Sequence, residues 1–473
     1  MKVFPVTING ESVISDTTFD VTNPALGTSF AKMSQSDDSH VDQAVKAARS
    51  VFPNWSALSS DERASYLMKL ATVIEDNAQE LAVLLTQENG KPLGGLEGIG
   101  SKMEVGGSIG WTQYTASLDL PVEILQDDDA MRIELHRKPL GVVVSIPPWN
   151  WPLMIAIWHI MPALRSGNTV VIKPSELTPL ATARFVELAN KVLPAGVLNC
   201  VGGDGKVGHA LVSHPDINKI IFTGSTPTGK SIMQAASADL KRVTLELGGN
   251  DAGIILPDTE INSVIRQIFV CCFHNNGQTC AALKRLYVHE SQYDEVVEEL
   301  QKLASEVKVG NGLDESTELG PLQNKRQLDV VSDLAKAAVE DGGTIVAGGR
   351  PLEGDGYFFQ PTIVTGLSDG NRLVDEEQFG PIIPVIKYSN IEDVIAQANK
   401  NENGLGGSLW SSDPEKAAKL ATKMETGSVW INDHGAVKPN APFGGVKQSG
   451  IGVEFAKQGL EEYTSVQTIH IMK

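Results

Sequence analysis

The segment that ends at Cys280 carries the clearest candidate for covalent chemistry. Residues 273–280 (FHNNGQTC) place this thiol behind a glycine and several polar residues, and two alanines follow it. A cysteine in an apolar run usually packs as a small hydrophobic residue, which is what we predict for Cys271 and Cys272. A cysteine in a polar loop can instead act as a nucleophile. Cys280 is therefore predicted to attack a carbonyl carbon and to carry an acyl thioester.

A carboxylate in apolar surroundings is the candidate general base. Glu246 lies in residues 245–250 (LELGGN), between leucines and just before two glycines. This pattern is typical of a strand that ends in a tight turn, where lost hydration raises the pKa of a carboxyl group. Such a group can accept a proton from a thiol or from water. The residues alone leave open a second interpretation, a glutamate that faces solvent at a strand edge.

The third candidate is an amide in a stiff turn. Asn150 stands in residues 148–152 (PWNWP), between two tryptophans and two prolines. Its side chain could donate a hydrogen bond to an oxyanion that develops during a reaction. It could also bond only to its own backbone, as asparagines in turns commonly do.

Together these three segments resemble the aldehyde dehydrogenase superfamily, in its NAD(P)-dependent, hydrolytic branch. The resemblance extends from about residue 20 to about residue 470. It implies that Cys280 attacks an aldehyde and that Asn150 and the Cys280 N–H bind the oxyanion. It also implies that Glu246 activates the water molecule that hydrolyses the thioester. The implied reaction is the oxidation of an aldehyde to a carboxylic acid, with NAD preferred and NADP a poorer cofactor.

Three other functions are compatible with parts of this sequence. A CoA-acylating aldehyde dehydrogenase is the nearest, but such members generally lack the glutamate at the position of Glu246. A non-catalytic structural relative is expected to have lost Cys280 or Glu246, and both are present. A Cys–His hydrolase that pairs His274 with Cys280 would leave the cofactor elements described next without a role.

The candidate phosphate site differs from the usual GxGxxG fingerprint. Residues 223–229 (TGSTPTG) follow a predicted strand and open a predicted helix, where hydroxyl and N–H groups suit a pyrophosphate. The resemblance implies that Ser225 contacts phosphate and that Gly224 and Gly229 allow close approach of the backbone. It assigns Lys173 and Glu176 to the hydroxyls of the adenosine ribose.

The nicotinamide end and the substrate tunnel are also assigned by the resemblance. Glu377 is expected to bind the nicotinamide ribose and Phe379 to pack on the nicotinamide ring. Ile146 and Trp149 are expected to line the same cleft. The expected tunnel residues are Trp151, Ile155, Trp158, Thr279 and Phe443. Because these are mostly aromatic and aliphatic, an apolar or aromatic aldehyde is favoured.

The elements that must position these residues are predicted from periodicity. Residues 59–62 (SSDE) have the spacing of a capping box, and apolar residues then recur at helical spacing up to Leu85. From residue 140 onward, short apolar runs alternate with helical stretches, which is typical of a parallel, doubly wound sheet. Strands are predicted at 141–146, 169–172, 197–201, 219–222 and 243–247.

The expected fold class is therefore α/β. A variant Rossmann-type cofactor domain is expected to comprise residues 1–118 and 139–248, and a second α/β catalytic domain residues 249–448. Residues 131–137 and 465–471 alternate apolar and polar side chains and are predicted to be exposed edge strands. In the family such segments pair to form a small β arm, here residues 119–138 and 449–473, which builds a homodimer or homotetramer.

Composition excludes several other classes. The 473 residues include 39 basic and 58 acidic side chains, a net charge of −19. Such a chain is poorly suited to nucleic acid or to anionic membranes. The four cysteines form no CxxC pair, so neither a metal site nor a disulfide framework is predicted. With no signal peptide evident, a cytoplasmic enzyme whose partner is a small-molecule aldehyde is expected.

Overall fold

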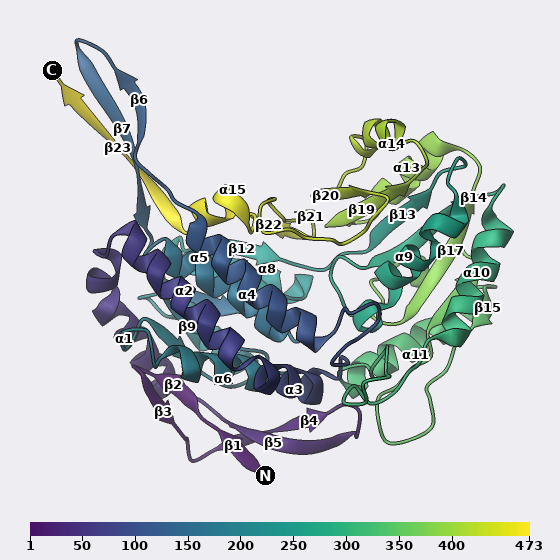
Figure 1. The fold of residues 1–473 in the computed structure, drawn as a ribbon, viewed down its shortest axis with the longest axis horizontal. Helices are drawn as coiled ribbons and strands as arrows, with labels where there is room; N and C mark the ends of the chain where they lie inside the picture. The colour runs from purple at the N-terminus through teal and green to yellow at the C-terminus, as the bar shows by residue number, and fades with distance from the viewer.

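The computed structural model describes residues 1–473 and has two lobes, from one of which a narrow arm projects (Figure 1). Each lobe is built on one large sheet. The first sheet has the strand order β22 (Gly450–Ile451), β12 (Arg242–Glu246), β11 (Lys219–Thr223), β8 (Val142–Ile146), β9 (Thr169–Ile172), β10 (Leu198–Cys200), β2 (Val6–Ile8) and β3 (Glu11–Val13).

The five central strands of this sheet are parallel. The chain runs outward from β8 through β9 to β10, then returns to β11 on the other side of β8 and continues to β12. The strand order therefore reverses between β8 and β11, and ligands of such sheets bind at the carboxyl ends beside that point. Ile146, Thr223 and Glu246 are the last residues of their strands, so they meet at this edge.

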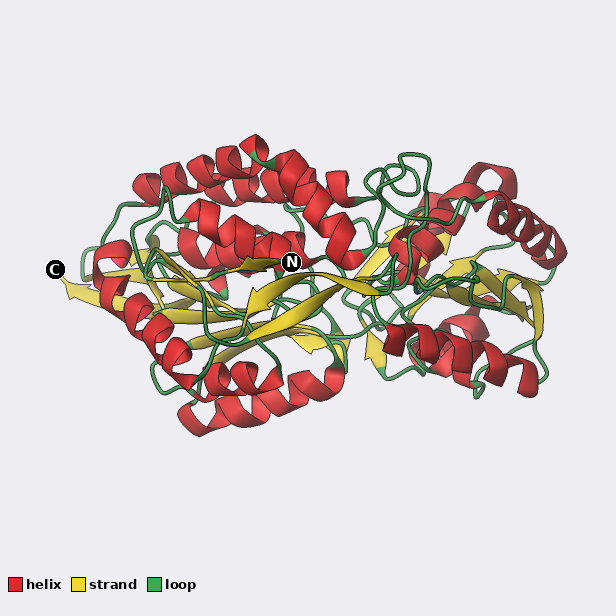
Figure 2. Cartoon of the chain, turned by 90° about the horizontal axis from the view of Figure 1, so that it is seen from below, coloured by secondary structure: helices red, strands yellow, loops and turns green.

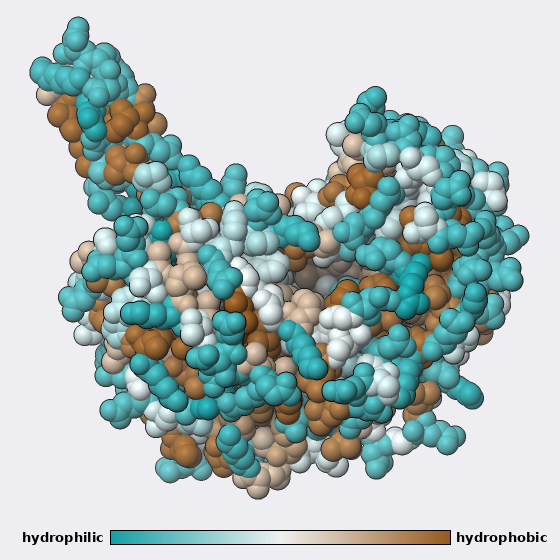
Figure 3. All heavy atoms as spheres, viewed as in Figure 1, coloured by the Kyte–Doolittle hydropathy of each residue, from teal (hydrophilic) through white to brown (hydrophobic).

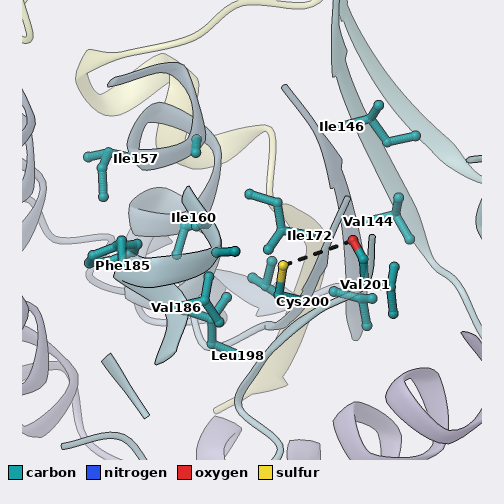
Figure 4. Packing of buried hydrophobic residues seen from close by; sticks show 14 of the residues in the cluster. Val144, Ile146, Ile157, Ile160, Ile172, Phe185, Val186, Leu198, Cys200 and Val201 are labelled. Carbon is teal, nitrogen blue, oxygen red and sulfur yellow. Dashed lines mark hydrogen bonds between the residues drawn. The ribbon is translucent and has the colours of Figure 1, made fainter. Parts of the chain in front are cut away.

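Helices cover both faces of the first sheet (Figure 2). One group contains α5 (Pro152–Arg165) and α6 (Leu180–Ala189), and another contains α1 (Asp38–Ser56), α7 (Gly205–Ser213) and α8 (Thr226–Ala236). Figure 4 shows the interior, where Val144, Ile160 and Phe185 pack around Cys200. The Cys200 thiol lies 3.9 Å from the carbonyl oxygen of Val201, and it is fully buried.

The second lobe has a mostly parallel sheet of its own. Its strand order is β15 (Thr344–Ala347), β16 (Thr362–Thr365), β17 (Ile382–Tyr388), β14 (Leu283–His289), β13 (Asp251–Ile255), β19 (Gly406–Trp410) and β20 (Ser428–Ile431). Only β15 is antiparallel to its neighbour. Helices α9 (Ile261–Phe273), α10 (Tyr293–Glu306) and α11 (Lys325–Glu340) pack against it. Cys271 and Cys272 are buried on α9, as predicted.

The predicted start of the amino-terminal helix is confirmed, but the prediction that this helix continues without a break is wrong. Ser59 and Glu62 form the predicted capping box at the start of α2 (Ser60–Asp76). A second helix, α3 (Ala78–Asn89), then begins after a break at Asn77. The Asn77 amide donates to the carbonyl oxygen of Val73 at 2.8 Å, which lets the side chain end α2 although the apolar spacing continues.

The arm is a three-stranded sheet in the order β23 (Thr464–Met472), β7 (Met131–Pro139) and β6 (Glu123–Asp127). The predicted pairing of the two alternating segments is confirmed, since β23 and β7 are antiparallel along their whole length. The prediction that both are edge strands is wrong for β7, which lies in the middle. Asp128 accepts hydrogen bonds from the N–H groups of Ala130 and Met131, and this tight turn folds β6 back onto β7.

Candidate active site

Two loops from different lobes meet at the predicted catalytic residues. One follows β8 and holds Asn150, and the other follows α9 and holds Cys280. The Asn150 side-chain amide donates to the carbonyl oxygen of Gln278 at 3.0 Å. The Trp151 indole N–H donates to the Thr279 hydroxyl at 3.0 Å. The structure therefore brings Asn150 next to the residues that immediately precede Cys280.

An unusual backbone turn presents Cys280 to the space between the lobes. Asn275, Asn276 and Gly277 are consecutive residues with left-handed φ values of 50°, 58° and 67°. Such backbone is sparsely populated by residues other than glycine and is typical of functional sites. A Cβ atom at Gly277 would lie 2.5 Å from the carbonyl oxygen of Gly380, so the turn has room only for glycine there.

Two hydrogen-bond donors remain available at this turn. The Cys280 N–H donates to no group of the protein. The Asn150 amide uses one N–H on Gln278 and keeps the other. An amide N–H and a backbone N–H beside a nucleophile are the donors that an oxyanion requires. The residues present could therefore bind an oxyanion formed next to the thiol.

The surroundings of the Cys280 thiol disfavour its ionised form. Burial raises the pKa of Cys280 to about 12, an effect that nearby Lys284 opposes and the charge of Glu246 increases. Lys284 donates to the Cys280 carbonyl oxygen at 2.6 Å. A thiol in this state needs a base to become a nucleophile. His274 forms no hydrogen bond with it, and burial lowers the pKa of His274 to about 4.

Glu246 has the environment of a general base. Its side chain is buried at the end of β12, and neither carboxyl oxygen has a hydrogen-bond partner. Burial raises the pKa of Glu246 well above its usual range, and the charge of Glu454 raises it further. A Cβ atom at Gly444 would lie 3.1 Å from Glu246 Oε1, so the carboxyl group packs against bare backbone. A buried carboxyl group without donors is suited to taking up a proton.

Glu454 is a site residue that the sequence did not reveal. It is 4% exposed, and its backbone pairs with that of Phe443 through two hydrogen bonds of 2.7 and 3.0 Å. His159 Nε2 lies 3.3 Å from Glu454 Oε1, and His159 Nδ1 lies 3.0 Å from the Ser145 hydroxyl. The one available signal was a glutamate among apolar and glycine residues (451–454, IGVE), the same signal that identified Glu246.

An apolar cluster extends from the thiol. The predicted tunnel residues Trp151, Ile155, Trp158 and Phe443 belong to it, with Cys280 at its edge. Thr279 joins it through its bond to Trp151. Three aromatic contacts continue the cluster, between Trp158 and Phe455 (4.8 Å between centroids), Trp111 and Phe455 (5.7 Å), and Trp111 and Trp158 (5.4 Å). A small cavity lies beside Trp111, Trp158 and Phe455.

Trp111, Met154 and Phe455 were missed in the sequence. Trp111 lies on α4 (Ser101–Ser117), which reads as an ordinary helix. Met154 is one position from the predicted Ile155 on α5. Phe455 has a left-handed φ of 67°, a conformation that sequence gives no reason to expect of a phenylalanine. Only the folded chain brings these side chains beside the thiol.

The predicted phosphate site is the amino end of α8. Ser225 is the residue before this helix, its hydroxyl caps no backbone N–H, and the first turn contains no acidic side chain. The two glycines have a structural reason of their own. A Cβ atom at Gly224 would lie 2.4 Å from the Phe222 ring, and one at Gly229 would lie 2.5 Å from Leu247. A helix end with free donors and no carboxylate fits an anionic diphosphate.

Lys173 and Glu176 lie beyond the carboxyl end of β9. The buried Lys173 ammonium donates to the carbonyl oxygens of Gly203 and Pro174 at 2.7 and 3.0 Å, and it lies 3.6 Å from Glu176 Oε2. Burial lowers the pKa of Lys173. The Glu176 side chain is 47% exposed, so its carboxylate can accept hydrogen bonds from a ligand's hydroxyls.

The nicotinamide end predicted from sequence spans both lobes. Glu377 Oε1 accepts from the Gly249 N–H and from Lys284, each at 3.1 Å. Phe379 packs edge-on against Trp149 with 5.3 Å between ring centroids. Ile146, the last predicted cleft residue, is 9% exposed at the end of β8. These groups and the end of α8 together offer the donors, acceptors and aromatic surface that a dinucleotide needs.

Comparison with known proteins agrees with this geometry. The model of the aldehyde dehydrogenase family matches residues 12–469. A phenylacetaldehyde dehydrogenase of Pseudomonas fluorescens is 39% identical over 473 aligned residues, covering 97% of this chain and 93% of the relative.

Two solved structures extend the agreement to the fold. The NAD+ complex of an aldehyde dehydrogenase from Bacillus cereus has a TM-score of 0.96 and 37% identity, covering 99% of this chain and 96% of that one. A betaine aldehyde dehydrogenase of Staphylococcus aureus in complex with NAD+ has a TM-score of 0.94 and 34% identity, covering 99% and 94%. The resemblance and the fold class predicted from sequence are confirmed: the chain belongs to the aldehyde dehydrogenase family.

Proposed function

We propose that the protein oxidises an aldehyde to a carboxylic acid with NAD, through a thioester on Cys280. One observation carries the assignment of roles. The Cys280 thiol lies at the edge of the apolar cluster, the partnerless carboxyl group of Glu246 is near enough for its charge to act on that thiol, and the Asn150 amide bonds to Gln278, two residues before Cys280. Membership of the aldehyde dehydrogenase family supports the reaction class. The NAD+ complexes of the B. cereus and S. aureus relatives support the cofactor.

In the proposed reaction, a base removes the Cys280 proton and the sulfur adds to the aldehyde carbon. The Asn150 amide and the Cys280 N–H bind the resulting oxyanion. NAD, when bound, accepts the hydride of the former aldehyde C–H, and the carbon becomes a thioester. Glu246 then takes a proton from water, which attacks the thioester. The carboxylic acid leaves, and the released thiolate recovers a proton.

The cofactor roles rest on the groups already described. We assign phosphate binding to Ser225 and the amino end of α8, and ribose binding to Lys173, Glu176 and Glu377. Phe379 and Trp149 would face the nicotinamide. The exposed carboxylate of Glu176 disfavours NADP, because the 2′-phosphate would place a like charge beside it.

An arylalkyl aldehyde is the proposed substrate. The cluster beyond Cys280 contains Trp111, Trp151, Trp158, Phe443 and Phe455, so it offers several aromatic rings. Aromatic side chains stack favourably on another ring. The name of the P. fluorescens relative, a phenylacetaldehyde dehydrogenase, points the same way.

The test uses the purified full chain with NAD and a panel of aldehydes, with NADH absorbance as the readout. We expect phenylacetaldehyde to have a higher kcat/KM than a short aliphatic aldehyde and than the cationic betaine aldehyde. NADH formation that requires CoA would favour the acylating alternative. No NADH with any aldehyde would favour a structural role.

The remaining assignments concern the whole molecule. We propose that residues 1–118 and 139–248 bind the cofactor and that residues 249–448 supply the nucleophile.

We propose that the arm, residues 119–138 and 449–473, joins subunits into a dimer or tetramer. Its exposed apolar residues include Ile124, Leu125, Val466 and Ile471, and Figure 3 shows apolar surface on the arm. A cytoplasmic location is proposed, and no helix is long and apolar enough to span a bilayer.

A further inference from the structure

We infer that Lys91, together with Asn275, positions the Asn150 donor for the oxyanion. Lys91 lies just after α3, far in sequence from the proposed catalytic residues, and it has no contact with Cys280. Its ammonium donates to the backbone carbonyl oxygen of Asn150 at 2.8 Å. The Asn275 amide donates to the same oxygen at 3.1 Å. These are the two shortest hydrogen bonds to this oxygen, and the Asn89 amide donates to it at 3.5 Å, so several donors fix the Asn150 peptide.

The same ammonium also reaches the neighbouring residue. Lys91 Nζ lies 3.6 Å from the centroid of the Trp151 ring, a cation–π contact. Trp151 in turn donates to the hydroxyl of Thr279, the residue that precedes Cys280. One buried charge therefore fixes the Asn150 backbone directly and contacts the segment before Cys280 through Trp151 and Thr279.

The charge of Lys91 is itself held in place. Its side chain and that of Glu104 are fully buried and form an ion pair. Glu104 Oε1 accepts from the N–H groups of Leu153 and Met154, at 2.9 and 3.1 Å, which are free donors at the start of α5. The ion pair therefore ties α4 and the start of α5 to the Asn150 turn.

A buried ion pair adds little net stability to a fold, because removing two charges from water costs about as much free energy as their attraction returns. Replacing such a pair with apolar side chains of similar size is often neutral or stabilising, whereas removing one partner is strongly destabilising. The hydrogen-bond donors that bind an oxyanion must stay in position, because a small misplacement of a catalytic group slows the reaction markedly. A buried ion pair beside them can keep their positions fixed. We therefore assign Lys91 a positioning role in catalysis, which rests on the proposed oxyanion role of Asn150.

The test is a double-mutant cycle on the full-length enzyme. Lys91→Met and Glu104→Gln are introduced together, so that no unpaired charge is left behind. This pair of substitutions is made in the natural chain and in Asn150→Ala. We expect it to lower kcat about 10-fold or more in the natural chain, with KM for NAD within about 2-fold. In Asn150→Ala it should lower kcat by less than about 2-fold, because the group it positions is gone.

Lys241→Met is the matched control. Lys241 is also buried, and its ammonium donates to the carbonyl oxygen of Val212 at 2.8 Å. It lies just before β12, at the opposite end of that strand from Glu246. Its substitution should leave kcat unchanged.

The outcomes separate the two proposals. If Asn150→Ala does not lower kcat, the oxyanion role is wrong and this inference is wrong with it. If Asn150→Ala lowers kcat but the paired substitution lowers it equally in both backgrounds, only the inference is wrong. Should the paired variant fail to fold, Asn275→Gly takes its place in the cycle. Glycine keeps the left-handed backbone and removes the amide, so an equal kcat loss in both backgrounds would again reject the inference.

Discussion

The two sides of the proposed active site are built in opposite ways. On the side of Asn150, the backbone carbonyl oxygen and one N–H of the side-chain amide are fixed by hydrogen bonds with Lys91, Asn275 and Gln278, and the second amide N–H stays free. On the side of Glu246, the carboxyl oxygens have no partner at all. A donor for an oxyanion must not move, whereas a base must change its protonation state. A fixed peptide with one free donor suits the first task, and apolar burial without partners suits the second.

Cys280→Ala should have the largest effect, because Cys280 is the proposed nucleophile and the other three cysteines are buried in other apolar clusters. Turnover should fall by more than about 10³-fold, since the covalent route is lost. NAD affinity, measured by fluorescence titration, should stay within about 2-fold. Retention of more than about a hundredth of the natural kcat, roughly 2.7 kcal/mol of barrier, would reject the nucleophile.

Glu246→Gln tests the side without hydrogen bonds. It should lower steady-state kcat by about 10²-fold or more, because water is no longer activated. Where attack on the aldehyde still proceeds, an acyl group should accumulate on Cys280, and intact-protein mass spectrometry after rapid quench would detect it. Unchanged turnover would remove Glu246 from the mechanism.

Asn150→Ala tests the hydrogen-bonded side. We expect kcat to fall by about 10²-fold, the usual effect of losing one oxyanion donor, with no acyl enzyme accumulating beyond the natural level. The acyl enzyme should thus distinguish the two substitutions, because it accumulates in Glu246→Gln and does not accumulate in Asn150→Ala. A change confined to KM for the aldehyde would show that Asn150 only shapes the pocket.

Glu454→Gln should change the pH profile more than the maximal rate. The charge of Glu454 helps to raise the pKa of Glu246, so its removal should lower that pKa. Glu246 acts in its deprotonated form, which would then be populated at lower pH. Because Glu246 is assigned to the hydrolysis of the thioester, the rising limb of the kcat profile should shift toward lower pH, and a limb that stays in place or moves upward would contradict the coupling.

Glu176→Ala should have the smallest effect, because this carboxylate is half exposed and contacts only the cofactor's adenosine end in the proposed site. It should narrow the preference for NAD over NADP, chiefly by lowering KM for NADP, since a like charge near the 2′-phosphate is removed. The readout is the ratio of kcat/KM for the two cofactors in both proteins. A natural enzyme that already prefers NADP would overturn the ribose assignment.

The sequence could predict the features that lie in short, unusual segments. Cys280, Glu246 and Asn150 each stand in a local pattern of glycines, prolines or aromatic residues, and the strands between residues 141 and 247 have clear apolar runs. The alternation of strands and helices was enough to predict the doubly wound sheet. These predictions need only nearest neighbours along the chain.

Features made by distant residues could not be predicted. The Lys91–Asn150 bond joins positions 59 residues apart, and nothing around Lys91 distinguishes it from a surface lysine. Glu454 and Phe455 reach the site only because the chain returns from the second lobe to add β22 beside β12. β7 lies in the middle of the arm because a turn at Asp128 folds β6 back onto it. The apolar periodicity of the sequence does not predict such a turn.

The pairing of β7 with β23 has a consequence for how the protein is made. A hydrogen bond between Ser465 and Lys138 closes a loop of 327 residues, so β7 leaves the ribosome long before its partner is synthesised. The segment that brings Phe443, Glu454 and Phe455 is also synthesised after the rest of the proposed site. A nascent chain should therefore stay without activity, and with an open strand edge, until these residues and β23 have been synthesised. Ribosome-bound chains stalled before residue 440 should accordingly be protease-sensitive at β7 and dependent on chaperones for solubility.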